Sequence, residues 1–307
     1  MKRSSNGILH RILTALATLW ALSLLVFLLT RFSGDPAVLL LPADASPEEL
    51  VQLRQQLGLD RSLLHQYFIY MTQAVRGDFG RSLRYGTSAM ALVLERLPAT
   101  MQLAAASAIV GWTLAIPLGI LAGARPNTFW DRLARLVSLF GQSMPVYWLG
   151  IVLIMVVSVR FGMVPASGRG TLAHMLLPVM ALSLNLMGSV TRVLRVQLQD
   201  ILKQDYIRSA RAKGLPMRSV LGKHALKNAG IGVVTVMGLQ LGALLGGTVV
   251  TETVFAWPGL GRLVVQAIQF RDFPLVQAGV IVLASVVIVV NVVTDLLYPL
   301  LDRRVGV

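Results

Sequence analysis

The sequence contains no cysteine and few charged residues, and both features narrow the classes of protein that it can encode. Of its 307 residues, 14% are charged and 55% are hydrophobic, a balance that is typical of a polytopic membrane protein rather than a soluble domain. The lack of cysteine excludes disulfides, thiolate zinc sites and a cysteine nucleophile. Acidic residues are also scarce, at 14 against 28 Lys and Arg. In a membrane protein such an excess reflects topology rather than nucleic-acid binding.

Six apolar stretches are long enough to cross a bilayer, whose hydrocarbon core requires about 20 residues of helix. The first is interpreted as a retained span rather than a signal peptide, because its apolar run is long and no small-x-small cleavage site follows it. The stretches are Ile8–Thr30, Pro98–Ala124, Leu133–Val159, Ala173–Leu194, Ala229–Val250 and Leu275–Leu300.

The sequence therefore predicts an all-α membrane protein with about six transmembrane helices. Its parts are an N-terminal tail and first helix (1–31), an extracytoplasmic segment (32–97) and a core of five transmembrane helices (98–307). The core includes a charged loop at 196–228, between the fourth and fifth spans. If the N-terminus is inside, 17 of the 28 Lys and Arg residues lie inside, which predicts that both termini and this loop are cytoplasmic.

The charged loop contains the stretch "DYIRSARAKGLPMRSVLGKHALKN" at 205–228. Its periodicity predicts two short helices with a corner between them. Gly214 suits the C-terminal end of the first helix and Pro216 the first turn of the second. The small residues Ser209, Ala210 and Ala212 would let another protein approach closely, so a docking element is favoured. The alternative is a topology determinant that contacts lipid headgroups.

The loop resembles the "EAA loop" in the membrane subunits of bacterial ATP-binding-cassette (ABC) importers. Within that superfamily, "DYIRSARAKGL" followed by "HALKNA" is similar to the version in dipeptide and oligopeptide permeases of the DppB/OppB type. When the loop is aligned on Gly214, the Glu-Ala-Ala positions fall on Arg208, Ser209 and Ala210, so only Ala210 matches the general pattern. Lys227 and Arg303 stand where many relatives have proline. Further segments resembling the family are "RFSGDPA", "GDFGRSL", "RLPATMQL", "GQSMPVYWLG" and "GGTVVTETVFAWPGLGRL".

The resemblance implies a passive permease subunit that forms half of a pathway for di- or oligopeptides. Relatives with the same architecture import nickel, metal chelates or glutathione, and the sequence does not separate these substrates. The implied partners are a second permease subunit, two ATPase subunits that bind ATP and magnesium, and an extracytoplasmic substrate-binding protein, in a bacterial cytoplasmic membrane. No cofactor, metal or nucleic acid is expected on this chain, which has no phosphate-binding loop. The coupling residues would be Asp205, Arg208, Ser209, Ala210, Arg211, Gly214 and Leu215.

Polar residues inside the spans are candidates for the translocation pathway, because polar side chains in lipid usually face a cavity or the bundle interior. Hydrogen bonds between helices explain each of them equally well. These residues are Gln102, Gln142, Asn185, Gln240, Glu252 and Asn291. A second cluster, at 144–148, is better interpreted as a proline-kinked helix with interfacial aromatics.

The segments expected outside contain two local signals. "SPEELVQLRQQLGL" from Ser46 has a helix start followed by apolar positions, which predicts a small helical cap. "FAWPGLGRL" predicts a tight irregular turn with aromatics at the membrane interface. The resemblance implies that these surfaces receive the substrate-binding protein.

The sequence disfavours two other classes of membrane protein. An intramembrane enzyme would need a nucleophile with its base or a metal set, and neither the relevant motifs nor suitably spaced histidines occur. A channel or ion-coupled secondary transporter usually needs charges deep in the membrane, whereas Glu252 and Asp295 lie near the ends of their spans. The sequence therefore favours an external source of energy.

Overall fold

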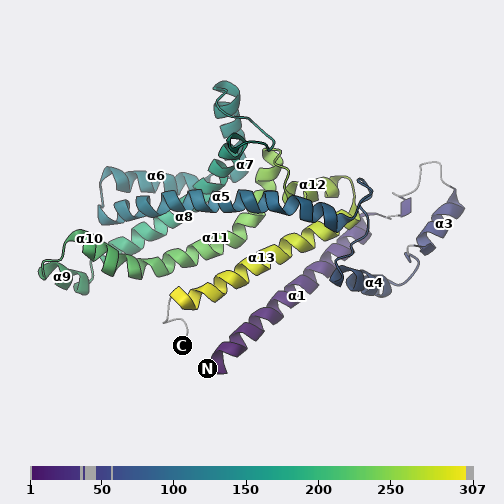
Figure 1. The fold of residues 1–307 in the computed structure, drawn as a ribbon, viewed down its shortest axis with the longest axis horizontal. Helices are drawn as coiled ribbons and strands as arrows, with labels where there is room; N and C mark the ends of the chain where they lie inside the picture. The colour runs from purple at the N-terminus through teal and green to yellow at the C-terminus, as the bar shows by residue number, and fades with distance from the viewer. Residues whose placement is uncertain (1, 35–36, 39–45, 57, 302–307) are drawn as a thin grey trace. The chain divides into compact units, whose positions relative to one another are not determined.

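The computed structural model describes residues 2–34, 37–38, 46–56 and 58–301, and these are almost entirely helical (Figure 1). Strand pairing among them is limited to an isolated bridge between Arg81 and Ser88. Within these described ranges, five helices are long and apolar enough to span a membrane, and a bent helix pair raises the number to six. The prediction of an all-α protein with about six spans is thus confirmed. Arg303 lies outside the described residues.

The chain forms two compact units, of which the first comprises residues 1–98 and 259–288. Its core contains Phe27, Tyr70, Phe79, Val93 and Leu260, all buried. Rings stack at its centre, with 5.6 Å between the centroids of Phe27 and Tyr70. The helices of this unit are α1 (Lys2–Ser33), α3 (Pro47–Gln56), α4 (Leu63–Val75), the start of α5 (Ala89–Ala124), α12 (Leu260–Gln269) and the start of α13 (Phe273–Leu301).

The helix predicted to begin at Ser46 is present as α3. The Ser46 hydroxyl accepts a hydrogen bond from Glu49 N at 3.2 Å, and the Glu49 carboxylate accepts one from Ser46 N at 2.9 Å. This reciprocal pair satisfies two backbone donors that a helix start otherwise leaves unpaired. Further along the chain, α4 inserts Tyr70 into the core of the first unit.

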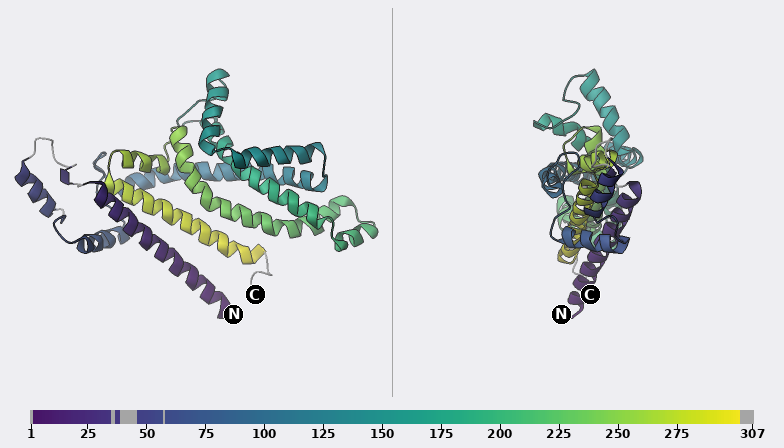
Figure 2. Two further views of the ribbon diagram at one scale, coloured as in Figure 1. Left: turned by 180° about the vertical axis from the view of Figure 1, so that it is seen from behind. Right: turned by 90° about the vertical axis from the view of Figure 1, so that its right-hand side faces the viewer.

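The second unit comprises residues 99–258 and 289–307. Within it, α6 and α11 both pack against α8 (Figure 1 and Figure 2). Glycines bring α6 and α8 together, since a Cβ atom on Gly188 would lie only 3.3 Å from Gly141 Cα. Close backbone approach through small residues is a common way for membrane helices to associate. The elements are α6 (Phe129–Ser143), α7 (Val146–Leu153), the π-helix η1 (Ile154–Arg160), α8 (Leu172–Ile201), α9 (Asp205–Ala212), α10 (Met217–Ser219), the π-helix η2 (Val220–Ala225) and α11 (Leu226–Val254).

The third predicted span is a broken helix. Helix α6 ends at Ser143 and α7 begins at Val146, with a bend of 106° between Phe129–Ser143 and Val146–Arg160. Pro145 causes the break because it has no N–H to donate to the carbonyl of Gly141, four residues earlier. The interpretation of this segment as a proline-kinked helix is therefore confirmed.

The charged loop differs in one respect from its prediction. Helix α9 and the corner at Gly214 are present, but the second short helix continues into α11 without a break. From Met217 the chain stays helical to Val254, through the π-helical segment η2. Nothing between these residues forces a break, because Gly222 has no positive φ angle and the nearest proline is Pro216.

Candidate functional site

The predicted coupling corner is attached firmly to the second unit. On α9, Ile207 is 0% exposed and Ala210 8% exposed, and both pack in a cluster with Leu198 of α8 and Val220 of η2. A side-chain hydrogen bond of 2.8 Å from Asn228 Nδ2 to the Tyr206 hydroxyl ties α9 to α11. Motion of α9 would therefore be transmitted to α8 and α11.

The turn that ends α9 depends on Gly214. Its φ angle is +79°, a left-handed conformation that costs other residues energy because of their Cβ atom. Leu215 N donates to Ala210 O at 3.3 Å, and Gly214 N donates to Arg211 O at 2.9 Å. This pair of bonds is the Schellman motif, which satisfies the last carbonyls of a helix. The sequence-based placement of Gly214 at the helix end is confirmed.

The remaining predicted coupling residues form the open surface of the corner. Arg208 lies 3.4 Å from Asp205, and Arg211 contacts Met217 Sδ at 3.3 Å. A Cβ atom on Gly214 would meet no other atom within 4 Å, so space for a partner exists here. Residues exposed at this surface are Asp205, Arg208, Ser209, Arg211, Gly214 and Leu215.

Among the predicted pathway residues, Asn185 supplies a hydrogen-bond donor at the break between α6 and α7. Its Nδ2 donates to Gly141 O at 2.9 Å, and Gly141 O is the carbonyl that Pro145 leaves without its helical donor. An unpaired carbonyl in a membrane costs several kcal/mol. The side chain of Asn185 therefore has a structural task at the bend.

Gln240 and Glu252 also join helices. Trp112 Nε1 on α5 donates to Gln240 Oε1 at 3.2 Å, and Gln240 Nε2 donates to Leu186 O on α8 at 3.1 Å. Glu252 on α11 is 0% exposed and accepts a hydrogen bond of 2.5 Å from the hydroxyl of Thr100 on α5. Both side chains are thus engaged in contacts between helices.

The other three pathway candidates are exposed. Gln102 Oε1 accepts a hydrogen bond of 2.8 Å from Arg169, which lies in the segment between η1 and α8. Gln142 lines a cavity between α6 and α8. Asn291 lies on α13, close to Gly242 of α11, where a Cβ atom would meet its Oδ1 at 2.5 Å.

The turn after α11 is tight, as predicted, and its aromatics are buried inside the protein. Ala256 has a positive φ of 49°, and Phe255 and Trp257 are only 2% and 1% exposed. Trp257 Nε1 donates to Ala99 O at 3.0 Å. The turn folds both rings inward, where the indole finds a backbone acceptor, so that the placement of these aromatics at a membrane interface stays a prediction.

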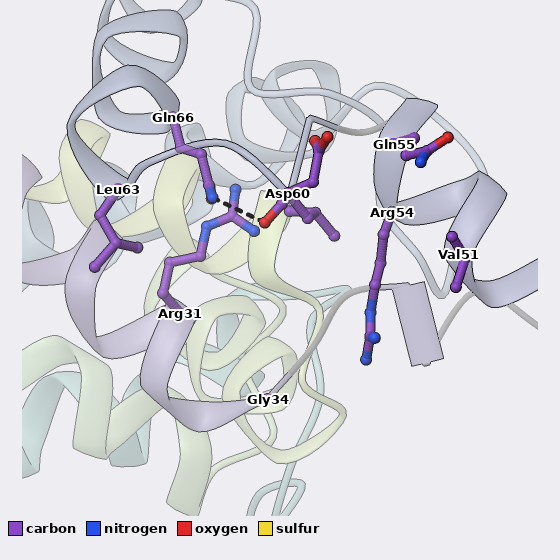
Figure 3. A pocket seen from close by; sticks show the side chains of 9 residues that line it. Arg31, Gly34, Val51, Arg54, Gln55, Asp60, Leu63 and Gln66 are labelled. Carbon is purple, nitrogen blue, oxygen red and sulfur yellow. Dashed lines mark hydrogen bonds between the residues drawn. The ribbon is translucent and has the colours of Figure 1, made fainter. Parts of the chain in front are cut away.

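A cavity of about 570 Å³ lies in the first unit, beside α1, α3 and α4 (Figure 3). Gln66 lines this cavity, and Gln66 Nε2 donates hydrogen bonds to Leu59 O at 3.1 Å and to Arg61 O at 2.8 Å. The residues that line it are Arg31, Gly34, Val51, Arg54, Gln55, Leu59, Asp60, Leu63 and Gln66. Among the described residues, no group of three or more His, Cys, Asp or Glu side chains could hold a metal ion.

Two buried carboxylates were not selected from the sequence. Asp131 on α6 is 1% exposed and pairs with Arg195 on α8 and, at 3.1 Å, with Arg135. Asp272, also 1% exposed, accepts a hydrogen bond from Ser82. The signal available in the sequence was a lone acid next to an arginine, as in "DRLAR" and "FRDF", but such a pair does not reveal burial.

The chain matches two family models that together cover nearly all of it. The model described as "Binding-protein-dependent transport system inner membrane component" matches residues 115–307, and that of the N-terminal part of such components matches residues 5–104. The chain belongs to this family. It is a multi-pass permease subunit of an ABC importer, a transport component rather than an enzyme.

Relatives of this permease match it from end to end. It is 39% identical over 301 residues to the "Glutathione transport system permease protein GsiC" of Escherichia coli (strain K12), covering 98% of both chains. It is 36% identical to the "Dipeptide transport system permease protein DppB" of the same strain, over 97% of this chain and 98% of the relative. The resemblance to peptide-type ABC permeases is thereby confirmed.

The fold of the permease is also that of solved ABC transporters. It matches a chain of the inward-facing MetNI methionine ABC transporter with a TM-score of 0.55 and 20% identity, over 69% of this chain and 97% of the other. A chain of an amino acid ABC transporter solved with histidines matches with a TM-score of 0.52 and 19% identity, over 69% and 94%.

Proposed function

We propose that this permease subunit conducts short peptides, with di- and oligopeptides as the main class. The observation that carries the proposal is the similarity from end to end to the dipeptide permease, in a chain whose loop "DYIRSARAKGL" has the form of the peptide permeases. Glutathione is the second candidate, supported by the 39% identity to a glutathione permease. Nickel and metal chelates are the alternative that transport assays must separate.

We further propose that the exposed corner after α9 docks into an ATPase subunit and transmits its movement. The buried residues Ile207 and Ala210 attach the corner to α8 and α11, while Arg208, Ser209 and Arg211 remain open to a partner. ATP binding in the ATPase pair would then shift the permease between two states, as in other switches driven by differential binding. ATP and magnesium would be held by those partner subunits.

The complete importer would contain a second permease subunit, two ATPases and a substrate-binding protein, in the cytoplasmic membrane of a bacterium. Of the six polar residues considered for the pathway, Gln102 and Asn291 are the better candidates, because both are exposed on membrane-spanning helices. Asn185, Gln240 and Glu252 make contacts between helices, and we infer that their main role is structural.

Uptake into proteoliposomes tests the substrate. The subunit would be reconstituted with the ATPases, second permease and binding protein captured with it from its native membrane and identified by mass spectrometry. Radiolabelled dialanine is expected to enter in an ATP-dependent manner, with competition from other dipeptides. Uptake of glutathione alone would select the second candidate, and uptake of nickel alone would refute the assignment to peptides.

The absence of cysteine makes the orientation straightforward to test. Ser209→Cys places a single thiol on the corner, and Ser167→Cys places one between η1 and α8. In intact spheroplasts a membrane-impermeant maleimide is expected to label the second thiol and not the first. Labelling of Ser209→Cys from outside would invert the topology and exclude docking to cytoplasmic ATPases.

A further inference from the structure

A basic cavity opens between α6 and α8 in the second unit, separate from the predicted coupling corner. Its volume is about 400 Å³. Three arginines line it together with polar groups, and its lining residues are Arg135, Ser138, Leu139, Gln142, Ser143, Arg192 and Arg195.

The cavity has more arginine side chains around it than acidic side chains that could neutralise them. Arg135 and Arg195 share a single carboxylate, Asp131, which also accepts a hydrogen bond from Asn127 N at 3.0 Å. Arg192 has no ion pair or hydrogen bond within the described ranges of the chain. Three guanidinium groups therefore face one carboxylate, which leaves the cavity with a net positive charge.

A buried hydroxyl in the wall lacks a partner. Ser138 is 7% exposed, and in the described part of the chain its Oγ has no hydrogen-bond partner. A buried polar group of this kind costs free energy unless a ligand or water satisfies it. A hydroxyl beside guanidinium groups suits an anion with several acceptor oxygens, such as a phosphodiester.

The surface around the cavity is apolar. Leu136, Leu139 and Phe140 on α6 are 51%, 60% and 46% exposed in this chain, and Leu139 lies in the cavity wall itself. A soluble anion would gain nothing from these side chains. A lipid would, because its acyl chains could cover them while its phosphate meets the arginines.

The position along the helices agrees with a headgroup site. At 1.5 Å per residue, Arg195 lies about 9 Å before the end of α8, and Ser138 about 13 Å after the start of α6. These are the helix ends expected at the cytoplasmic side, and basic pockets between helices on that side are suited to anionic headgroups.

We propose that the cavity between α6 and α8 binds the phosphodiester headgroup of an anionic phospholipid. Arg192 and Ser138 contact the phosphate, Arg195 and Arg135 are held in place by Asp131, and the acyl chains lie on Leu136, Leu139 and Phe140. The proposal concerns regulation or stabilisation by lipid and does not depend on which solute the permease carries.

Native mass spectrometry of the full importer in detergent provides the test, with titrations of phosphatidylglycerol, phosphatidylcholine and inorganic phosphate. Phosphatidylglycerol is expected to bind more tightly than phosphatidylcholine. Arg192→Gln is expected to weaken its binding about fivefold, as for one basic residue at an anionic surface, and Ser138→Ala about threefold. Arg160→Gln is the matched control, because Arg160 is an exposed arginine at the end of η1, outside the cavity.

Each other outcome overturns the proposal in a recognisable way. An equal loss in the Arg160→Gln variant would mean unspecific attraction to a basic chain. Displacement of the lipid by millimolar phosphate would indicate a site for a soluble anion. Binding to the isolated permease but not to the assembled importer would show that the second permease or another subunit covers the cavity.

Discussion

The hydroxyl of Ser82 donates a hydrogen bond of 2.5 Å to the carboxylate of Asp272, 190 residues further along the chain. Both side chains are buried, at 2% and 1% exposure. The same carboxylate accepts hydrogen bonds from Arg84 N at 3.3 Å and from Leu275 N at 3.4 Å. One acidic residue thus caps the start of α13 and joins it to the "GDFGRSL" segment, which lies far away in the sequence but in the same unit.

Replacing Asp272 with alanine is expected to destabilise the first unit by about 2–4 kcal/mol. The reason is the loss of a helix cap together with charge-assisted hydrogen bonds to groups that stay buried. Thermal unfolding of the purified protein in detergent measures the effect. Asp200→Ala is the matched control, because Asp200 is 69% exposed and 3.9 Å from Lys203. Equal stability of the two variants would contradict the role of Asp272.

Gly214→Ala is expected to abolish ATP-driven uptake while leaving the protein inserted and folded. The added Cβ meets no atom in this chain, but alanine in the left-handed conformation costs about 1–2 kcal/mol, which distorts the proposed docking surface. Uptake and ATP hydrolysis in proteoliposomes would both be measured. Gly222→Ala is the control, since Gly222 has equal space and no positive φ. Normal uptake by the Gly214 variant would rule out the corner as a coupling element.

Arg195 and Arg135 contact the same carboxylate but should differ in their contribution to stability. The side chain of Arg195 is 18% exposed and that of Arg135 is 52% exposed. Arg195→Gln leaves the buried Asp131 without its main partner and is expected to cost about 3–5 kcal/mol. Arg135→Gln removes an exposed contact and should cost less than about 1 kcal/mol. The unfolding midpoints of the two variants measure these costs. A larger loss of stability in Arg135→Gln than in Arg195→Gln would refute this ranking.

Asn185→Leu is expected to cost about 1–3 kcal/mol, because Gly141 O would lose its donor at the break between α6 and α7. Gln52→Leu serves as control, because Gln52 is an exposed amide on α3, outside the bend and the cavity between α6 and α8. If Asn185 acted instead through contact with the solute, the variant would unfold normally and show only an altered KM for uptake. Stability and uptake measured on the same preparation separate these roles.

Tyr70 should titrate abnormally. Burial, and secondarily the neighbouring Tyr67, raises the pKa of Tyr70 from 10.0 to about 12. The folded state therefore holds the phenol proton more tightly than the unfolded state. The free energy of unfolding is unaffected by this group below pH 10, and it falls as the pH rises from about 10 to 12, by at most about 2.7 kcal/mol. In a pH titration followed by tyrosinate absorbance, the Tyr70→Phe variant is expected to lack the component that titrates at the highest pH. A titration unchanged by this substitution would disprove the shift.

Much of the local structure is determined by the sequence itself. Apolar runs of about 20 residues are sufficient for the long helices, because the chain in lipid must satisfy its backbone internally. The end of α9 at Gly214 and the start of α3 at Ser46 depend on residues within one turn of each other. These features were predictable because the groups that stabilise them are neighbours in the sequence.

The tertiary structure decided the features whose partners are distant. Only the fold brings Asn185 to the carbonyl freed by Pro145, Asp272 to Ser82 and Thr100 to Glu252. It also turned Phe255 and Trp257 inward and placed Ser138 beside the arginines of α8. Periodicity in a sequence gives the face of a helix on which a side chain lies, but not what packs against that face. For buried polar groups the hydrogen-bonding partner determines their role, and that partner was supplied by the packing of distant helices.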